Sequence, residues 1–108
     1  MESVEEKIRY HQLYDIYSQL LTEKQRMYFE YYYLDDYSLS EVSTILDVSR
    51  NAVHDQVKIV ISHLEHYEET LHLFENQEKR HQILSQLHEI TKEAEIEQLL
   101  IELEKIEV

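Results

Sequence analysis

The chain has 108 residues, with 10 lysines and arginines against 23 aspartates and glutamates, and it contains no glycine, proline or cysteine. A chain of this length builds one domain, residues 1–108, around one core. The missing glycines exclude the phosphate loops of nucleotide enzymes, and the missing cysteines exclude disulfides and thiolate sites. Because no long apolar run is present and residues 1–10 are too charged for a signal peptide, we expect a cytoplasmic protein with no membrane insertion.

Apolar residues at helical spacing predict two helices in the first third of the chain. The first ends near Leu21. The second follows Thr22, because Thr22 and Gln25 have the pattern of a capping box, in which each side chain accepts a hydrogen bond from an unpaired backbone amide. This second helix reaches about Leu34, where two aspartates interrupt the pattern.

A helix-turn-helix is predicted within residues 38–64. Ser38 and Glu41 form a second capping box that opens a short helix ending at Leu46. Ser49 is placed as the N-cap of a fourth, long helix, so that only a tight turn separates the two. The buried stripe of this long helix is expected to consist of Val53, Val57, Ile61 and Leu64, with Val60 beside them.

Two coiled-coil-like apolar stripes follow, and the phase slips between Thr91 and Ile96. Residues 76–107 are therefore predicted to form a helical hairpin or one bent helix. The stripes fit either an intramolecular core or a seam between two copies, and their large apolar area favours a homodimer. The candidates for the dimer seam are Leu87, Ile90, Leu99, Leu103 and Ile106.

The stretch from Tyr37 to His54 resembles the helix-turn-helix of sigma-factor region 4. Asp47 stands where many members of that group have glycine, at a turn position that tends towards the left-handed region, which Asp tolerates better than most residues. One departure concerns the second helix, where the apolar residue is Val57 and the usual position holds Gln56. The resemblance implies an all-α, sigma-region-4-like fold, here with a long fourth helix and a C-terminal helical extension.

Over nearly its whole length the chain is similar to a narrower family, the YlxM-type helix-turn-helix proteins. The segments that carry the similarity are Leu20–Arg26, Tyr32–Leu39, Val48–Val53, His66–Glu69 and Leu71. The resemblance implies a small bacterial protein associated with the signal recognition particle pathway, with the particle's GTPase, its RNA or both as partners. It also implies a non-enzymatic accessory or regulatory role.

The outer face of the predicted fourth helix supplies the candidate binding residues Arg50, Asn51, His54 and Lys58. In a DNA reader, such residues at the start of the recognition helix contact bases and phosphates. The formal net charge of −13 repels a polyanion, however, and Asp55 lies on the same face. The pattern therefore favours a surface for a protein or an RNA–protein complex, and a sequence-specific DNA-binding transcriptional regulator is the alternative.

No catalytic, cofactor or metal site is predicted. His63 and His66 lack the further ligands that zinc requires, and no His-Glu-x-x-His pattern is present. Adjacent carboxylates such as Glu68 and Glu69 are expected on a solvated helix face, because an acid-rich chain produces such pairs by chance. The sequence therefore indicates a protein that is not an enzyme.

Overall fold

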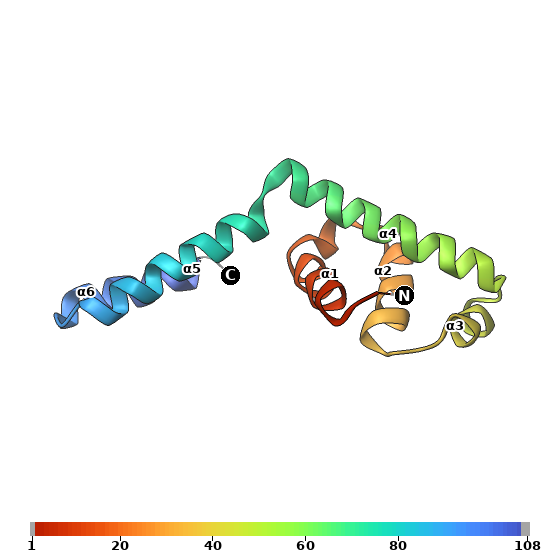
Figure 1. Ribbon diagram of the computed structural model, residues 1–108, viewed down its shortest axis with the longest axis horizontal. Coiled ribbons are helices and arrows are strands. Elements are labelled where there is room, and N and C mark those ends of the chain that lie inside the picture. Colours follow the sequence, from red (N-terminus) through yellow and green to blue (C-terminus); the bar gives the residue numbers. More distant parts are fainter. Residues whose placement is uncertain (1, 107–108) are drawn as a thin grey trace. The chain divides into compact units, whose positions relative to one another are not determined.

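The computed structural model describes residues 2–106, and this part of the chain is helical without any strand, which confirms the all-α prediction. The chain divides into two compact units, residues 1–72 and 73–108 (Figure 1). Unit 1 contains α1 (Val4–Tyr17), η1 (Ser18–Leu20), α2 (Glu23–Phe29), η2 (Glu30–Leu34), α3 (Leu39–Leu46) and α4 (Arg50–Leu71). Unit 2 contains α5 (Leu73–Ile90) and α6 (Ala94–Ile106). That the whole chain forms one domain stays a prediction.

Side-chain caps begin α2, α3 and α4 where the sequence predicts them. At α2, the backbone N–H of Gln25 donates to Thr22 Oγ1 at 3.1 Å, and the N–H of Thr22 donates to Gln25 Oε1 at 2.9 Å. The same reciprocal pair joins Ser38 and Glu41 at α3. Ser49 caps α4 by accepting from a backbone amide at 3.0 Å, so both capping boxes and the N-cap are confirmed.

Two helix ends differ from the simple α-helical prediction. The first helix is α-helical only to Tyr17 and then tightens into the 3₁₀ turn η1. The second helix widens into the π-helix η2, whose last turn is closed by the N–H of Asp35 donating to the carbonyl of Glu30 at 2.8 Å. A π turn advances the chain by one extra residue and so rotates the side chains that follow. Here it turns Tyr33 into the core against Phe29.

Helix α4 is the central element of unit 1, because α1, α2 and α3 all pack against it (Figure 1). The predicted stripe lies on the packed side: Val53, Val57, Val60 and Leu64 are buried and Ile61 is half-buried. Opposite them lie the buried side chains Leu13, Tyr17, Tyr28, Phe29 and Val42. The rings of Tyr14 and Phe29 stack at a centroid distance of 4.1 Å and link α1 to α2. Burial of these apolar and aromatic groups stabilises the bundle.

In unit 2, α5 and α6 are joined by a short turn and pack as a helical hairpin. Leu84 and Leu100 are its buried side chains. His88 bridges the two helices, with Nδ1 on Glu97 and Nε2 on Glu104. Within residues 2–106, no helix has the length and apolar character needed to cross a bilayer.

Candidate partner-binding site

The turn between α3 and α4 has the geometry that the sequence predicts. Asp47 adopts the left-handed conformation with φ 53°, and its N–H donates to the carbonyl of Ser43. Val42 and Val53 are fully buried between the two helices, whereas Leu46 and Val48 are half-buried. This packing holds α4 at a defined angle to α3 and leaves the first turns of α4 open on one side.

The four predicted binding residues are exposed on the first turns of α4. Arg50, His54 and Lys58 follow one another at four-residue steps, and Asn51 lies beside this row. They are exposed because Val53 and Val57, which alternate with them along the helix, turn towards the core. Val57 is buried, as the predicted stripe requires, and Gln56 is half-buried. The structure thus brings the four side chains together, while their binding role stays a prediction.

The charge of this outer face is mixed. Nδ1 of His54 lies 3.7 Å from Oδ1 of Asp55, and the two side chains are 55% and 74% exposed. At these exposures water and salt screen the pair, so it holds neither side chain firmly. The face therefore offers two permanent cations, Arg50 and Lys58, together with a carboxylate and polar groups.

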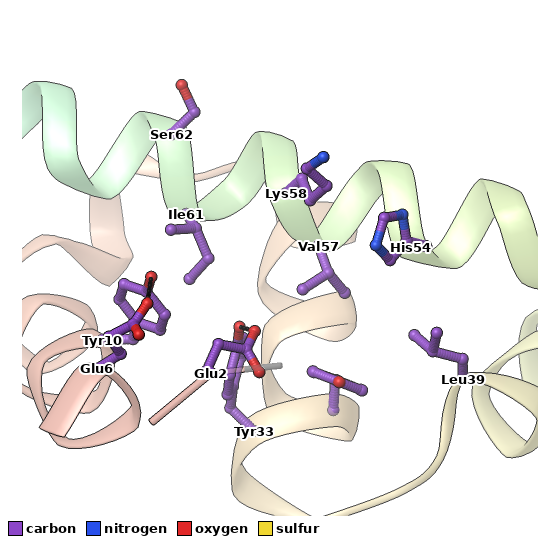
Figure 2. Close-up of a pocket in the computed structure, with 11 residues that line it drawn as sticks. Glu2, Glu6, Tyr10, Tyr33, Leu39, His54, Val57, Lys58, Ile61 and Ser62 are labelled. Atoms are coloured by element: carbon purple, nitrogen blue, oxygen red, sulfur yellow. Dashed lines mark hydrogen bonds between the residues drawn. The ribbon is translucent and has the colours of Figure 1, made fainter. Parts of the chain in front are cut away.

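A groove of about 620 Å³ lies beside this face and was not predicted from the sequence (Figure 2). It runs between α4, the start of α1, the π-helix and the first residue of α3. The side chains that line it are Glu2, Glu6, Tyr10, Tyr32, Tyr33, Leu39, His54, Val57, Lys58, Ile61 and Ser62. His54 and Lys58 thus belong to the outer face and to the edge of the groove at once. The sequence has a tyrosine-rich segment at this place, but such a segment does not by itself predict a groove.

The acidic side of the groove is held in place by tyrosines. The hydroxyl of Tyr33 donates to Glu2 Oε1 at 2.5 Å, and the hydroxyl of Tyr10 donates to Glu6 Oε2 at 3.3 Å. Burial raises the pKa of both phenols, and the neighbouring carboxylates raise it further. The phenols therefore stay protonated at neutral pH and donate to the carboxylates at the rim.

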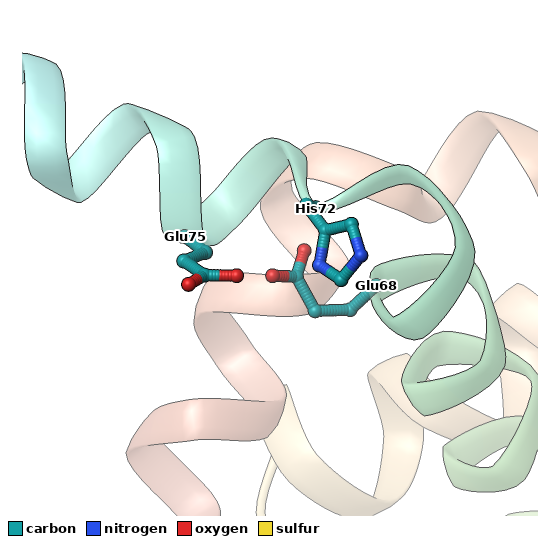
Figure 3. A group of neighbouring side chains, drawn as sticks. All are labelled: Glu68, His72 and Glu75. Atoms are coloured by element: carbon teal, nitrogen blue, oxygen red, sulfur yellow. The ribbon is translucent and has the colours of Figure 1, made fainter.

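The prediction that Glu68 lies on a solvated face is wrong. Its side chain lies near the end of α4 (Figure 3) and is buried. It accepts a hydrogen bond of 2.6 Å from the hydroxyl of Tyr17. His72 ends α4 in the left-handed conformation, and its N–H donates to the backbone carbonyl of Glu68 at 2.8 Å. The tertiary partner of Glu68 lies 51 positions away in α1, so no local pattern could reveal it. Glu69, its neighbour, is exposed as predicted.

The candidates for the dimer seam lie on the hairpin of unit 2. Leu87 is half-buried, whereas the other four, Ile90, Leu99, Leu103 and Ile106, are 74%, 64%, 47% and 78% exposed. The contact between α5 and α6 uses Leu84 and Leu100 instead. The predicted seam is therefore available on the surface of the hairpin.

Comparison with known proteins shows similarity along almost the entire chain. The family model described as "Putative helix-turn-helix protein, YlxM / p13 like" matches residues 4–104. A UPF0122 protein of Halalkalibacterium halodurans is 47% identical over 105 residues, which cover 96% of each chain. Another, of Anoxybacillus flavithermus, is 43% identical over 109 residues, covering 96% of this chain and 99% of the relative. The relative named YofM in Lactococcus lactis subsp. lactis is 43% identical over 104 residues, covering 89% of this chain and 94% of the relative.

Proposed function

The chain belongs to the YlxM / p13-like family of helix-turn-helix proteins, and from that premise we propose that it is a non-enzymatic accessory or regulatory protein. It binds its partner with the outer face of α4. One observation carries the proposal: Arg50, Asn51, His54 and Lys58 are exposed together on the first turns of the second helix of the helix-turn-helix. The mixed charge of this face fits a protein or an RNA–protein complex better than a bare polyanion.

The partner we propose is the signal recognition particle GTPase, its RNA or both. This part of the proposal rests on the resemblance of the chain to YlxM-type proteins. The same resemblance suggests that the scaffold is of the sigma-region-4 type, put to a use other than promoter recognition. The net charge of −13 supports a use other than promoter recognition, because it lowers the affinity of the chain for a long polyanion such as duplex DNA.

Co-purification from a bacterial extract tests this partner. Full-length tagged protein should retain the targeting GTPase or its RNA at low salt, as detected by mass spectrometry and RNA sequencing. The variant Arg50→Ala/Asn51→Ala should lose most of the retained partner, whereas Lys24→Ala/Lys92→Ala, which changes exposed side chains elsewhere, should retain it. Elution of the targeting complex without this chain would refute the assignment.

A second candidate function is sequence-specific DNA binding in transcriptional regulation. The observation that favours it is the confirmed geometry of the turn, which presents Arg50 and Asn51 at the start of α4, where recognition helices contact base edges. Selection from a pool of genomic fragments should then enrich one site, and Arg50→Ala/Lys58→Ala should abolish its footprint. A pool that shows no enrichment with the native protein would exclude this function.

We also propose that the protein is a homodimer joined through the hairpin of unit 2. This unit is shorter than about 40 residues and has no disulfide, and its residues up to 106 include two buried leucines. Units of this size usually require oligomerisation. A second hairpin would cover the exposed seam residues and complete a four-helix bundle. Light scattering should give twice the 13.2 kDa mass of the chain. The variant Leu99→Gln/Leu103→Gln should have the mass of the monomer, whereas the control Ile59→Gln, at an exposed site on α4, should keep the mass of the dimer. A monomeric native protein would refute the dimer.

A further inference from the structure

We propose that the groove beside α4 binds a basic amphipathic helix of a partner protein. The inference rests on the proposed function, because it names the class of partner segment that meets this side of α4. It concerns residues other than Arg50 and Asn51, neither of which lines the groove. The two proposals can therefore fail separately.

The floor of the groove suits apolar side chains. Val57 and Ile61 point from α4 towards the ring of Tyr33, and Leu39 closes the end next to α3 (Figure 2). The π-helix contributes two consecutive rings, those of Tyr32 and Tyr33, which meet edge to face at 4.9 Å. Such a floor receives anchor residues at i, i+3, i+4 and i+7 of a helix, which is how helical peptides bind in grooves.

The charges at the rim of the groove favour a partner segment with positive charge. Glu2 and Glu6 lie on the side of α1, and their tyrosine partners leave each carboxylate with further acceptor positions. Lysine or arginine side chains flanking the apolar anchors would pair with them. Lys58 and His54 on the opposite edge, which belongs to α4, would accommodate a carboxylate or a backbone carbonyl. The chain as a whole attracts a basic segment, since its formal charge is −13.

Two other occupants fit these charges poorly. A nucleic-acid strand would bring its phosphates to the carboxylates of Glu2 and Glu6. A second copy of this chain would offer α6, an amphipathic helix of its hairpin. Within Ala94–Ile106 that helix carries four glutamates and a single cation, Lys105; the glutamates are Glu95, Glu97, Glu102 and Glu104. Like charges at the rim oppose either arrangement.

Fluorescence anisotropy with labelled model peptides tests the proposal on the full-length protein. The probe is a helical peptide about four turns long, with leucines at i, i+3, i+4 and i+7 and lysines on both flanks. A second peptide has the same leucines and carries glutamate in place of lysine. The variant Glu2→Gln/Glu6→Gln removes the rim charges and keeps the capping box of α1, because glutamine also serves at its third position. The matched control Glu5→Gln/Asp15→Asn removes the same charge from exposed positions of α1 outside the groove.

The basic peptide should bind at about 0.15 M salt, and the acidic peptide should not. The groove variant should weaken binding roughly fivefold, as expected for the loss of two exposed ion pairs, and the control should stay within about twofold. Absence of binding, equal weakening by the control, or tighter binding of the acidic peptide or of a single-stranded oligonucleotide would overturn the proposal. The co-purification experiment separates the two proposals. If the groove variant retains the partner from the extract and Arg50→Ala/Asn51→Ala does not, the groove proposal is overturned and the proposed function stands.

Discussion

At the scale of single residues, the features that could be predicted are those whose partners lie within one helical turn. The capping serines and threonine act on an amide three positions away, so their chemistry is readable from spacing alone. Asp47 was also predictable, because a tight turn without glycine must place some residue in the left-handed region. Glu68 was not, because its burial depends on Tyr17 in another helix.

Replacing Asp47 with glycine should stabilise unit 1. Asp47 has φ 53°, which glycine adopts without cost, and the expected gain is about 0.5–1 kcal/mol after the larger entropy of glycine in the unfolded chain is included. All nine tyrosines lie between Tyr10 and Tyr67, so urea unfolding followed by the near-UV tyrosine signal reports unit 1 alone. Asp55→Gly in the second turn of α4 is the control and should lose about 0.3 kcal/mol of stability. A loss of stability at Asp47 as well would contradict the expected gain.

At the scale of elements, periodicity predicted the number and order of the helices in unit 1, whereas their local form required tertiary packing. Nothing in the composition of residues Glu30–Leu34 distinguishes this π-helix from an ordinary α-helix. Four consecutive aromatic and apolar residues, Tyr31 to Leu34, can occupy several faces of a helix. The packing of Tyr33 against Phe29 selects the wider turn. In the same way, the phase slip near Thr91 indicated a corner or a bend, and the structure has a hairpin there.

The hairpin of unit 2 should lose stability as the pH rises. The carboxylates of Glu97 and Glu104, which face His88 from α6, raise the pKa of its imidazole above the usual value. A group whose pKa is raised on folding contributes stability that is complete below its unfolded pKa and is lost as the pH passes its folded pKa. Amide hydrogen exchange in α5 and α6, corrected for the intrinsic rate, should therefore accelerate above about pH 6.5. The His88→Gln protein should not show this change, and an equal change in both proteins would rule out His88 as its source.

At the scale of the whole molecule, the excess of acidic residues decides which partners can approach. Long-range repulsion acts before any contact forms, and a formal charge of −13 outweighs the two cations of the α4 face at a distance. At contact, the local arrangement matters more, because the face and the groove present both signs of charge within a few residues.

Random duplex DNA should consequently bind very weakly. At about 0.15 M salt we expect a dissociation constant weaker than about 10⁻⁴ M, measured by anisotropy with a labelled duplex of mixed sequence. Lowering the salt should strengthen binding only slightly, because few phosphates are neutralised. A micromolar constant with a steep dependence on salt would show that the basic residues of α4 outweigh the net charge.

The sequence by itself determined the helical class, the capped starts of α2, α3 and α4, and the exposed row on α4, because each follows from neighbours a few positions apart. Only the tertiary structure decided the π-helix, the burial of Glu68 and the groove between α1 and α4. These features depend on side chains that are distant along the chain, such as Glu2 and Tyr33, and meet only after the helices have packed. The physical reason is that spacing specifies which face a residue occupies, whereas packing specifies what lies opposite that face.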